Sequence, residues 1–300
     1  MTADRSHLVQ LLKNVKDIPS LPDIAVRVMQ MTRDPDIVAE DLDRVISRDP
    51  ALTSNILRLC NSAYYGLPRV ISSLLQAIMY LGFHTVRNLV LTCALSELMG
   101  GDRAIYGHGP GGLWTCSFAC GVASQQLCRR VRVGQQHGAF TAGLLRDIGK
   151  VLIQPKIKDT ESTLVEMMTE RGLSLLEAER RTLGYTHTEI GAALADHWSF
   201  PHELVHAILH HHRPSEAKSV SLVTTVVHVA DVMVINRGYG VVLPQLRYPL
   251  DDEAARMCKI TVEMIEEVAS DLDIHVTSIS EVFPGKPSDS TGARDPASRG

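Results

Sequence analysis

The stretch AFTAGLLRDIGKVLI, residues Ala139–Ile153, places a single carboxylate, Asp147, in the middle of an otherwise apolar helical segment. A buried aspartate is costly unless a cation, hydrogen bonds or a metal ion compensates its charge. The rest of the chain supplies candidates for this role, and these are Cys116, Arg146, His187, the run His210–His212 and Asp231. We therefore expect the functional centre to form around Asp147.

The composition indicates an all-α protein. The chain has 300 residues, of which 45% are hydrophobic and 5% aromatic, so it can bury a sizeable core in one large domain or two small ones. Apolar residues recur at spacings of three and four in most windows, which is the period of an amphipathic helix. The formal charge is −4 with acidic and basic residues interspersed, and this argues against a global field for nucleic acid or an anionic membrane.

The cysteines and the N-terminal residues bear on the compartment. Six cysteines lie in apolar helical patterns without a CxxC pair, which predicts reduced, buried thiols. Residues 1–16 lack the apolar core and small-residue cleavage site of a signal peptide. No uncharged apolar run approaches the ~20 residues of a membrane-spanning helix. We expect a cytoplasmic protein with no membrane partner.

Turn and capping signals divide the chain into expected helices. Two segments that contain Asp-Pro each precede a predicted helix, with Asp36 and Asp49 predicted as N-caps. Thr186 and Glu189 form a capping-box pattern. Gly82 is predicted to end one helix before the next begins. The expected helices cover residues 22–32, 38–47, 51–62, 73–81, 85–99, 113–131, 139–157, 158–170, 174–183, 187–198, 201–212, 220–236 and 251–271.

The same signals predict a two-lobed helical bundle. The Gly-rich segment 100–112 is the best internal boundary, and it does not have the pattern of a phosphate-binding loop. The expected parts are a lead segment 1–17, an N-terminal lobe 18–99, the connection 100–112, a second lobe 113–236, a C-terminal loop and helix 237–283, and a disordered tail 284–300 rich in Pro, Ser and Gly.

The polar residues allow two interpretations. Two imidazoles and two carboxylates that converge in a helical bundle would suit a divalent metal ion that activates water. The structural alternative is commoner, and in it Asp147 and Asp231 are held by Arg146, Lys150 or backbone amides. Consecutive helical residues point about 100° apart, so at most two of the histidines at 210–212 can face one centre.

Two other groups of residues are expected to be structural. Cys116 and Cys120 lie one helical turn apart, but their apolar neighbours favour packing over binding of a soft metal. Arg129, Arg130 and Arg132 form a basic cluster that is more typical of a solvated helix end than of a nucleic-acid surface.

Several blocks in order along the chain resemble the HDOD domain, a non-catalytic relative of the HD and HD-GYP metal-dependent phosphohydrolases that is found in bacterial signalling proteins. The resemblance covers Ile18 to Asn236. The matching blocks are IPSLPDIAVRVM, ISRDPALTSNILRLCNSAYYG, SLLQAIMYLGFHTVRNLVL, LWTCSFACGVA, AGLLRDIGKVLI, THTEIGAALADHWSFP, ILHHHRP and VHVAD.

The departures from the catalytic relatives are informative. Where those relatives carry a metal-binding His and a paired His-Asp, this chain has Cys116 and Arg146-Asp147, so two imidazole ligands are missing. The residues that remain at positions of the family's metal shell are Asp147, His187, His211 or His212, and Asp231. A guanidinium within ~4–6 Å of Asp147 can serve as its counter-ion in place of a metal.

The resemblance therefore implies a bacterial signal-transduction regulatory module without catalysis, which binds signalling proteins in trans and needs no cofactor. Its degenerate pocket is expected to comprise Cys116, Arg146, Asp147, His187, His211, His212 and Asp231, with a small molecule or nucleotide as a possible ligand. The alternative is a metal-dependent phosphohydrolase acting on a nucleotide or cyclic dinucleotide, with one divalent ion on Asp147, His187, His211 and Asp231. Binding to nucleic acid has little support, since the chain lacks a basic stripe.

Overall fold

The described part of the computed structural model is built from helices and loops, without a β-strand. It comprises residues 18–100, 111–131, 136–157, 160–239 and 248–280. The helices are α2 (Asp23–Met31), α3 (Ala39–Ile46), α4 (Pro50–Cys60), α5 (Leu74–Met99), α6 (Gly112–Val131), α7 (Gln136–Leu145), α8 (Ile148–Ile157), α9 (Glu161–Thr169), α10 (Leu175–Leu183), α11 (His187–His197), α12 (His202–His210), α13 (Leu222–Asn236), α14 (Asp252–Met257) and α15 (Val262–Ser280), with a short 3-10 turn at Pro214–Glu216. The all-α prediction is confirmed.

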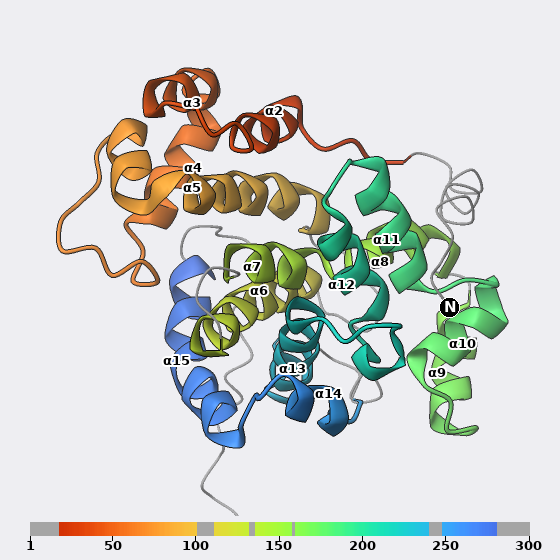
Figure 1. Ribbon diagram of the computed structural model, residues 1–300. Coiled ribbons are helices and arrows are strands. Elements are labelled where there is room, and N and C mark those ends of the chain that lie inside the picture. Colours follow the sequence, from red (N-terminus) through yellow and green to blue (C-terminus); the bar gives the residue numbers. More distant parts are fainter. Residues whose placement is uncertain (1–17, 101–110, 132–135, 158–159, 240–247, 281–300) are drawn as a thin grey trace, which may run out of the picture.

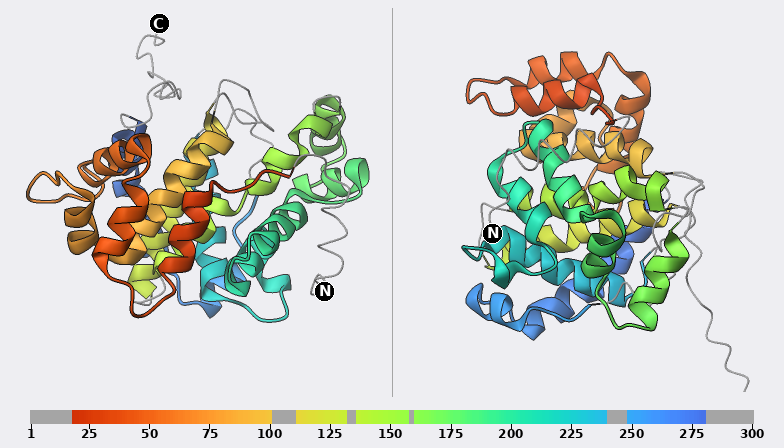
Figure 2. Two further views of the ribbon diagram at one scale, coloured as in Figure 1. Left: turned by 90° about the horizontal axis from the view of Figure 1, so that it is seen from above. Right: turned by 90° about the vertical axis from the view of Figure 1, so that its right-hand side faces the viewer.

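The helices form two groups that share one long helix. Helices α2, α3 and α4 lie at one end of the molecule and α9 and α10 at the other, and the views in Figures 1 and 2 agree on this. Between them, α6 packs against α7, α13 and α15, while α11 packs against α8 and α12. Helix α5 contacts α2, α3 and α4 and also α6, α7 and α8, so it joins the two groups through one continuous core.

Helix α5 contains the break that the sequence predicted at Gly82. This residue has φ 79° and ψ 163°, which is open to glycine but strained for other residues, and the helix resumes directly after it. By length and composition alone α5 could cross a membrane, but 56% of its most apolar window is buried inside the fold. Its contacts with helices on both sides are those of a core helix.

Most of the predicted caps are present. Asp49 accepts a hydrogen bond from the Leu52 amide at 2.9 Å, and Pro50 is the first residue of α4. Both hydrogen bonds of the Thr186–Glu189 capping box form at the start of α11. The cap predicted at Asp36 is wrong, because the N-cap residue of α3 is Val38, two residues further on, and no side chain caps this helix.

Two predicted helices are each divided in the structure. The segment 139–157 breaks at Arg146 and Asp147, which lie in a turn between α7 and α8, so Asp147 is not in the middle of a helix. The segment 251–271 divides into α14 and the longer α15, because Lys259 has φ 59° and ends α14. The predicted lead segment 1–17, residues 101–110 of the Gly-rich connection and the predicted tail 284–300 lie outside the described residues.

Candidate functional site

Arg146 lies fully buried at the centre of the second helix group. Its Nε donates a hydrogen bond to Asp231 Oδ1 at 2.5 Å, and its Nη1 donates to the Gly143 carbonyl at 3.1 Å. Its Nη2 lies 3.0 Å from Cys116 Sγ and 3.3 Å from Asp147 Oδ2. Burial opposes the charged form, but Asp231, Cys120, Asp147 and Cys116 together outweigh it and raise the pKa of Arg146 well above its usual value. The guanidinium is thus a fixed positive charge.

Asp147 is held between two buried cations. Its Oδ1 lies 3.0 Å from Lys150 Nζ, and Arg146 faces its other oxygen. Burial raises the pKa of a carboxyl, yet Lys150 and Arg146 together keep the pKa of Asp147 well below its usual range. The predicted pairing of the carboxylate with a guanidinium is therefore present, and Lys150 strengthens it.

Asp231, which projects from α13, is fully engaged by other groups. One oxygen binds Arg146, and the other accepts a short hydrogen bond from the Tyr248 hydroxyl. Burial and the neighbouring Asp231 raise the pKa of Tyr248 well above its usual value, so the phenol stays protonated and keeps donating. Asp231 therefore belongs to the Arg146 network.

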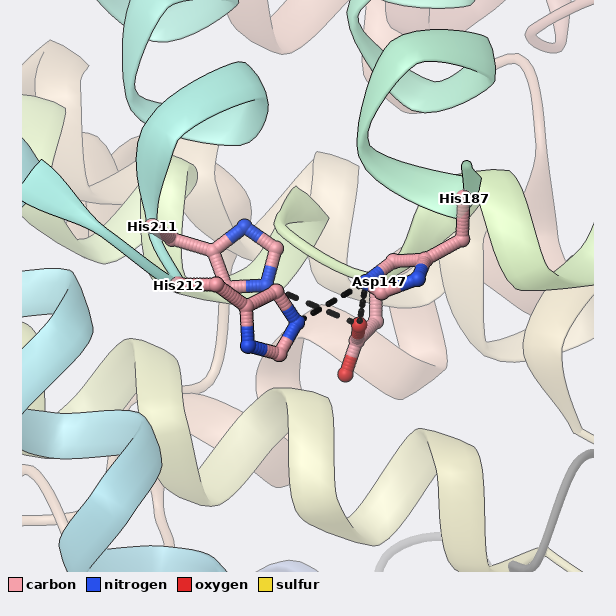
Figure 3. Close-up of side chains that lie close together, drawn as sticks. All are labelled: Asp147, His187, His211 and His212. Carbon is pink, nitrogen blue, oxygen red and sulfur yellow. Dashed lines mark hydrogen bonds and ion pairs between the residues drawn. The ribbon is translucent and has the colours of Figure 1, made fainter. Parts of the chain in front are cut away.

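A second cluster lies on the other side of Asp147, where Figure 3 shows three histidines around the carboxylate. The His187 Nε2 lies 3.3 Å from Asp147 Oδ1 and 3.1 Å from His212 Nε2, and His211 Nε2 lies 3.8 Å from Asp147 Oδ1. The four ligand atoms all lie within 4.8 Å of one another. His187 starts α11, while His211 and His212 follow the last turn of α12, so three separate segments meet here.

Hydrogen bonds behind the rings set the direction of the ligand atoms. His187 Nδ1 faces Glu179 Oε1 at 2.7 Å, and His211 Nδ1 faces the Ile208 carbonyl at 2.9 Å. Because a carboxylate and a carbonyl only accept, each Nδ1 carries the proton and each Nε2 turns toward the centre. Burial lowers the pKa of His211 to about 4, so this ring is neutral at pH 7. Its Nε2 is buried and has no hydrogen-bond partner among the described residues.

The cluster fits one divalent ion. Three imidazole nitrogens and a carboxylate oxygen are a ligand set typical of zinc and similar metals. Ligand atoms about 2.0–2.1 Å from a tetrahedral ion lie about 3.3 Å apart. Three of the separations here are 3.1, 3.3 and 3.8 Å, and all lie within 4.8 Å. The orphaned Nε2 of His211 is the kind of buried polar atom that a metal would satisfy. Between Cys116 and Asp231, in contrast, the guanidinium of Arg146 takes up the space.

The structure brings all seven predicted pocket residues to one centre, where they form two groups, one around Arg146 and one around the histidines, with Asp147 in both. Of the four residues predicted as metal ligands, Asp147, His187 and His211 come together, and His212 takes the place assigned to Asp231. His210 turns to the other side of α12, where its ring lies 4.7 Å from that of His206. The sequence did not single out Glu179 or Tyr248, whose places depend on tertiary packing.

A cavity of about 540 Å³ reaches this centre from the surface. His212 and Tyr248 line it, together with Met168, the segment 172–177 and the residues around Arg213 and Asp251. A cavity of this size lies within the range of small-molecule sites. The cavity therefore gives solutes a path to one edge of the histidine cluster.

Solved structures with the same arrangement of helices define the class of this fold. An HDOD domain protein of unknown function from Geobacter sulfurreducens has a TM-score of 0.75 at 24% identity, over 93% of this chain and 98% of that one. A proposed phosphohydrolase from Shewanella amazonensis has a TM-score of 0.72 at 24% identity, over 92% and 97%. These likenesses show an all-helical fold of the HDOD type.

The family follows from the sequence match. The family model of the HDOD domain matches residues 18–214, and the chain belongs to that family. An uncharacterized protein of Treponema pallidum is 27% identical over 221 residues, which are 71% of this chain and 41% of that protein. The chain thus spans about two fifths of the length of this relative.

Proposed function

We propose that this HDOD chain is a cytoplasmic regulatory module of bacterial signal transduction that acts through contacts with other proteins and does not hydrolyse phosphoesters. The observation that carries the proposal is the buried guanidinium of Arg146, which joins Asp147 and Asp231. In the catalytic proteins that the chain resembles, histidines stand at the positions of Cys116 and Arg146, and both would bind metal.

The charge of Arg146 argues against a metal ion beside it. A divalent ion about 4 Å from a guanidinium meets a repulsion of about 8 kcal/mol at an effective dielectric constant of about 20. A neutral imidazole would instead supply a ligand. The guanidinium cannot lose its proton in a protein, so the repulsion would persist at every accessible pH.

The regulatory part of the proposal draws on the relatives. A proposed signal transduction protein from Marinobacter aquaeolei shares the fold with a TM-score of 0.71 at 20% identity, and this chain covers 64% of it. Relatives longer than this chain are consistent with a module that works together with other segments or proteins. The cysteines among the described residues form no disulfide bond with one another, and most of them are buried, which supports a reducing compartment such as the cytoplasm.

The second candidate is a metal-dependent phosphohydrolase that acts on a nucleotide or cyclic dinucleotide. It is favoured by the cluster of Asp147, His187, His211 and His212 and by the cavity that reaches it. A metal ion held there could supply Lewis-acid chemistry and an activated water. The chain's own contribution would be to orient the imidazoles through Glu179 and to keep Asp147 ionised through Lys150.

Hydrolysis assays separate the two candidates. Wild-type protein loaded with Mn²⁺, Fe²⁺ or Zn²⁺ is incubated with a cyclic dinucleotide and with bis-p-nitrophenyl phosphate, beside Asp147→Asn, which keeps the size of the side chain. We expect no product above that of the variant from either substrate. Turnover by the wild type that Asp147→Asn loses, with both proteins folded by circular dichroism, would establish the hydrolase instead.

A further inference from the structure

Helix α12 carries a row of histidines on the side that faces away from the centre. His202, His206 and His210 follow one another at intervals of four residues, so they lie one above the other on the helix. Their ring centroids are 6.2 Å apart between His202 and His206 and 4.7 Å apart between His206 and His210. His202 is exposed and the other two rings are half-buried, so solvent reaches the row.

The spacing of the second pair is suited to a shared metal ion. Because a metal–imidazole bond is about 2.0–2.1 Å long, two rings on one tetrahedral ion have centroids about 5 Å apart. His206 and His210 are close to this separation. His202 and His210 are separated by two helical turns, a rise of about 12 Å, so the three rings cannot bind a single ion.

One ring of the pair is already held in place. His206 Nδ1 lies 2.9 Å from Thr224 Oγ1 on the adjacent helix α13, which leaves Nε2 as the nitrogen available for another ligand. Partners of this kind behind a ligand fix the ring orientation in metal sites. Burial and the neighbouring His202 also lower the pKa of His206, which favours the neutral ring that a metal requires.

We infer that His206 and His210 form a surface site for one transition-metal ion of the kind that prefers imidazole, such as Zn²⁺, Ni²⁺ or Cu²⁺. This site is separate from the buried cluster of Asp147, since His211 and His212 turn toward that cluster from the next two positions. Water would complete the coordination on the exposed side. An ion there would also bridge the last turn of α12, which directly precedes His211 and His212 of the inner cluster.

The first test uses untagged full-length protein on a resin bearing chelated Ni²⁺. His187 and His211 are fully buried, so of the inner cluster only His212, which lines the cavity, has a path to the resin. We expect the resin to retain the wild type and let His206→Ala and His210→Ala pass through. The control His197→Ala, which removes an exposed histidine of α11, should be retained. Retention of His206→Ala equal to that of the wild type would overturn the proposal.

The second test measures affinity in solution by competition for Zn²⁺ with a chromophoric chelator, in an Asp147→Ala background so that the inner cluster does not contribute. Loss of a supporting partner already weakens metal binding about tenfold or more, so loss of a ligand at 206 or 210 is expected to weaken this site at least as much. His202→Ala is expected to change the affinity less than about threefold, because its ring lies outside the pair. If His202→Ala abolished binding and His210→Ala did not, the assignment would be wrong.

Discussion

Replacing Arg146 with alanine is expected to lower the free energy of unfolding by about 3–5 kcal/mol, because the change leaves buried carboxylates without their cation. Asp231 would lose the 2.5 Å hydrogen bond from Nε, and Asp147 would lose its guanidinium but keep Lys150 and His187. Arg146→Lys keeps the charge but cannot reproduce the fork of donors that reaches Asp231, Cys116 and Gly143 together, so we expect an intermediate loss. Urea unfolding of the two variants measures both losses of stability.

The control for this variant is an arginine whose ion pair is exposed. Arg44 pairs with Asp41 at 3.1 Å, with 68% and 43% of the two side chains exposed. Such pairs contribute about 0–1 kcal/mol, so Arg44→Ala should change the unfolding free energy little. If Arg146→Ala cost no more than Arg44→Ala, the guanidinium would not be the counter-ion that holds the two acids.

Gly149→Ala is expected to have the other large effect, a loss of about 3 kcal/mol or more in the free energy of unfolding. A Cβ at this position would lie 2.0 Å from the His187 carbonyl oxygen and 2.7 Å from the Gly191 amide. Both neighbours are backbone atoms at the crossing of α8 and α11, so neither can move aside without displacing a helix. Overpacking costs about 1–3 kcal/mol in ordinary cores and more where the backbone must shift.

Gly138→Ala is the matched control, since it makes the same substitution in α7 where a Cβ would meet no atom within 4 Å. Alanine is favoured over glycine within a helix by up to about 1 kcal/mol, so this variant should be neutral or more stable. Thermal and urea unfolding of the two variants provide the comparison. Equal stability of Gly149→Ala and Gly138→Ala would contradict the close crossing of α8 and α11.

Local sequence signals predicted most of the fold because they act within a few residues. The Asp49 cap, the Thr186–Glu189 box and the break at Gly82 are each present where expected. The turn at Arg146 was missed because the apolar spacing continues through it. The backbone at Gly149 lies very close to the start of α11. This is a tertiary contact, and the spacing of apolar residues along the sequence does not reveal it.

The sequence predicted which residues belong to the candidate site better than it predicted which of them contact one another. The resemblance to HDOD proteins brought Asp147, His187, His211 and Asp231 to one centre, and His212 was named beside His211. Which of these residues come together depends on how α12 ends and on which groups bind Asp231. In the structure, Asp231 is bound by Arg146 and Tyr248. Side-chain direction beyond a helix end is set by packing, which the sequence alone did not show.

The measurement that tests the central claim most directly is the number of metal ions bound per chain. The protein is purified without chelator in a His206→Ala background, so that the surface pair does not contribute. Because Arg146 stands where a second ion would need a ligand, we predict at most one equivalent of metal per chain, and we expect Asp147→Ala to lose it. A second equivalent is expected only in the double variant Cys116→His, Arg146→His. Two equivalents with Arg146 in place would contradict the account.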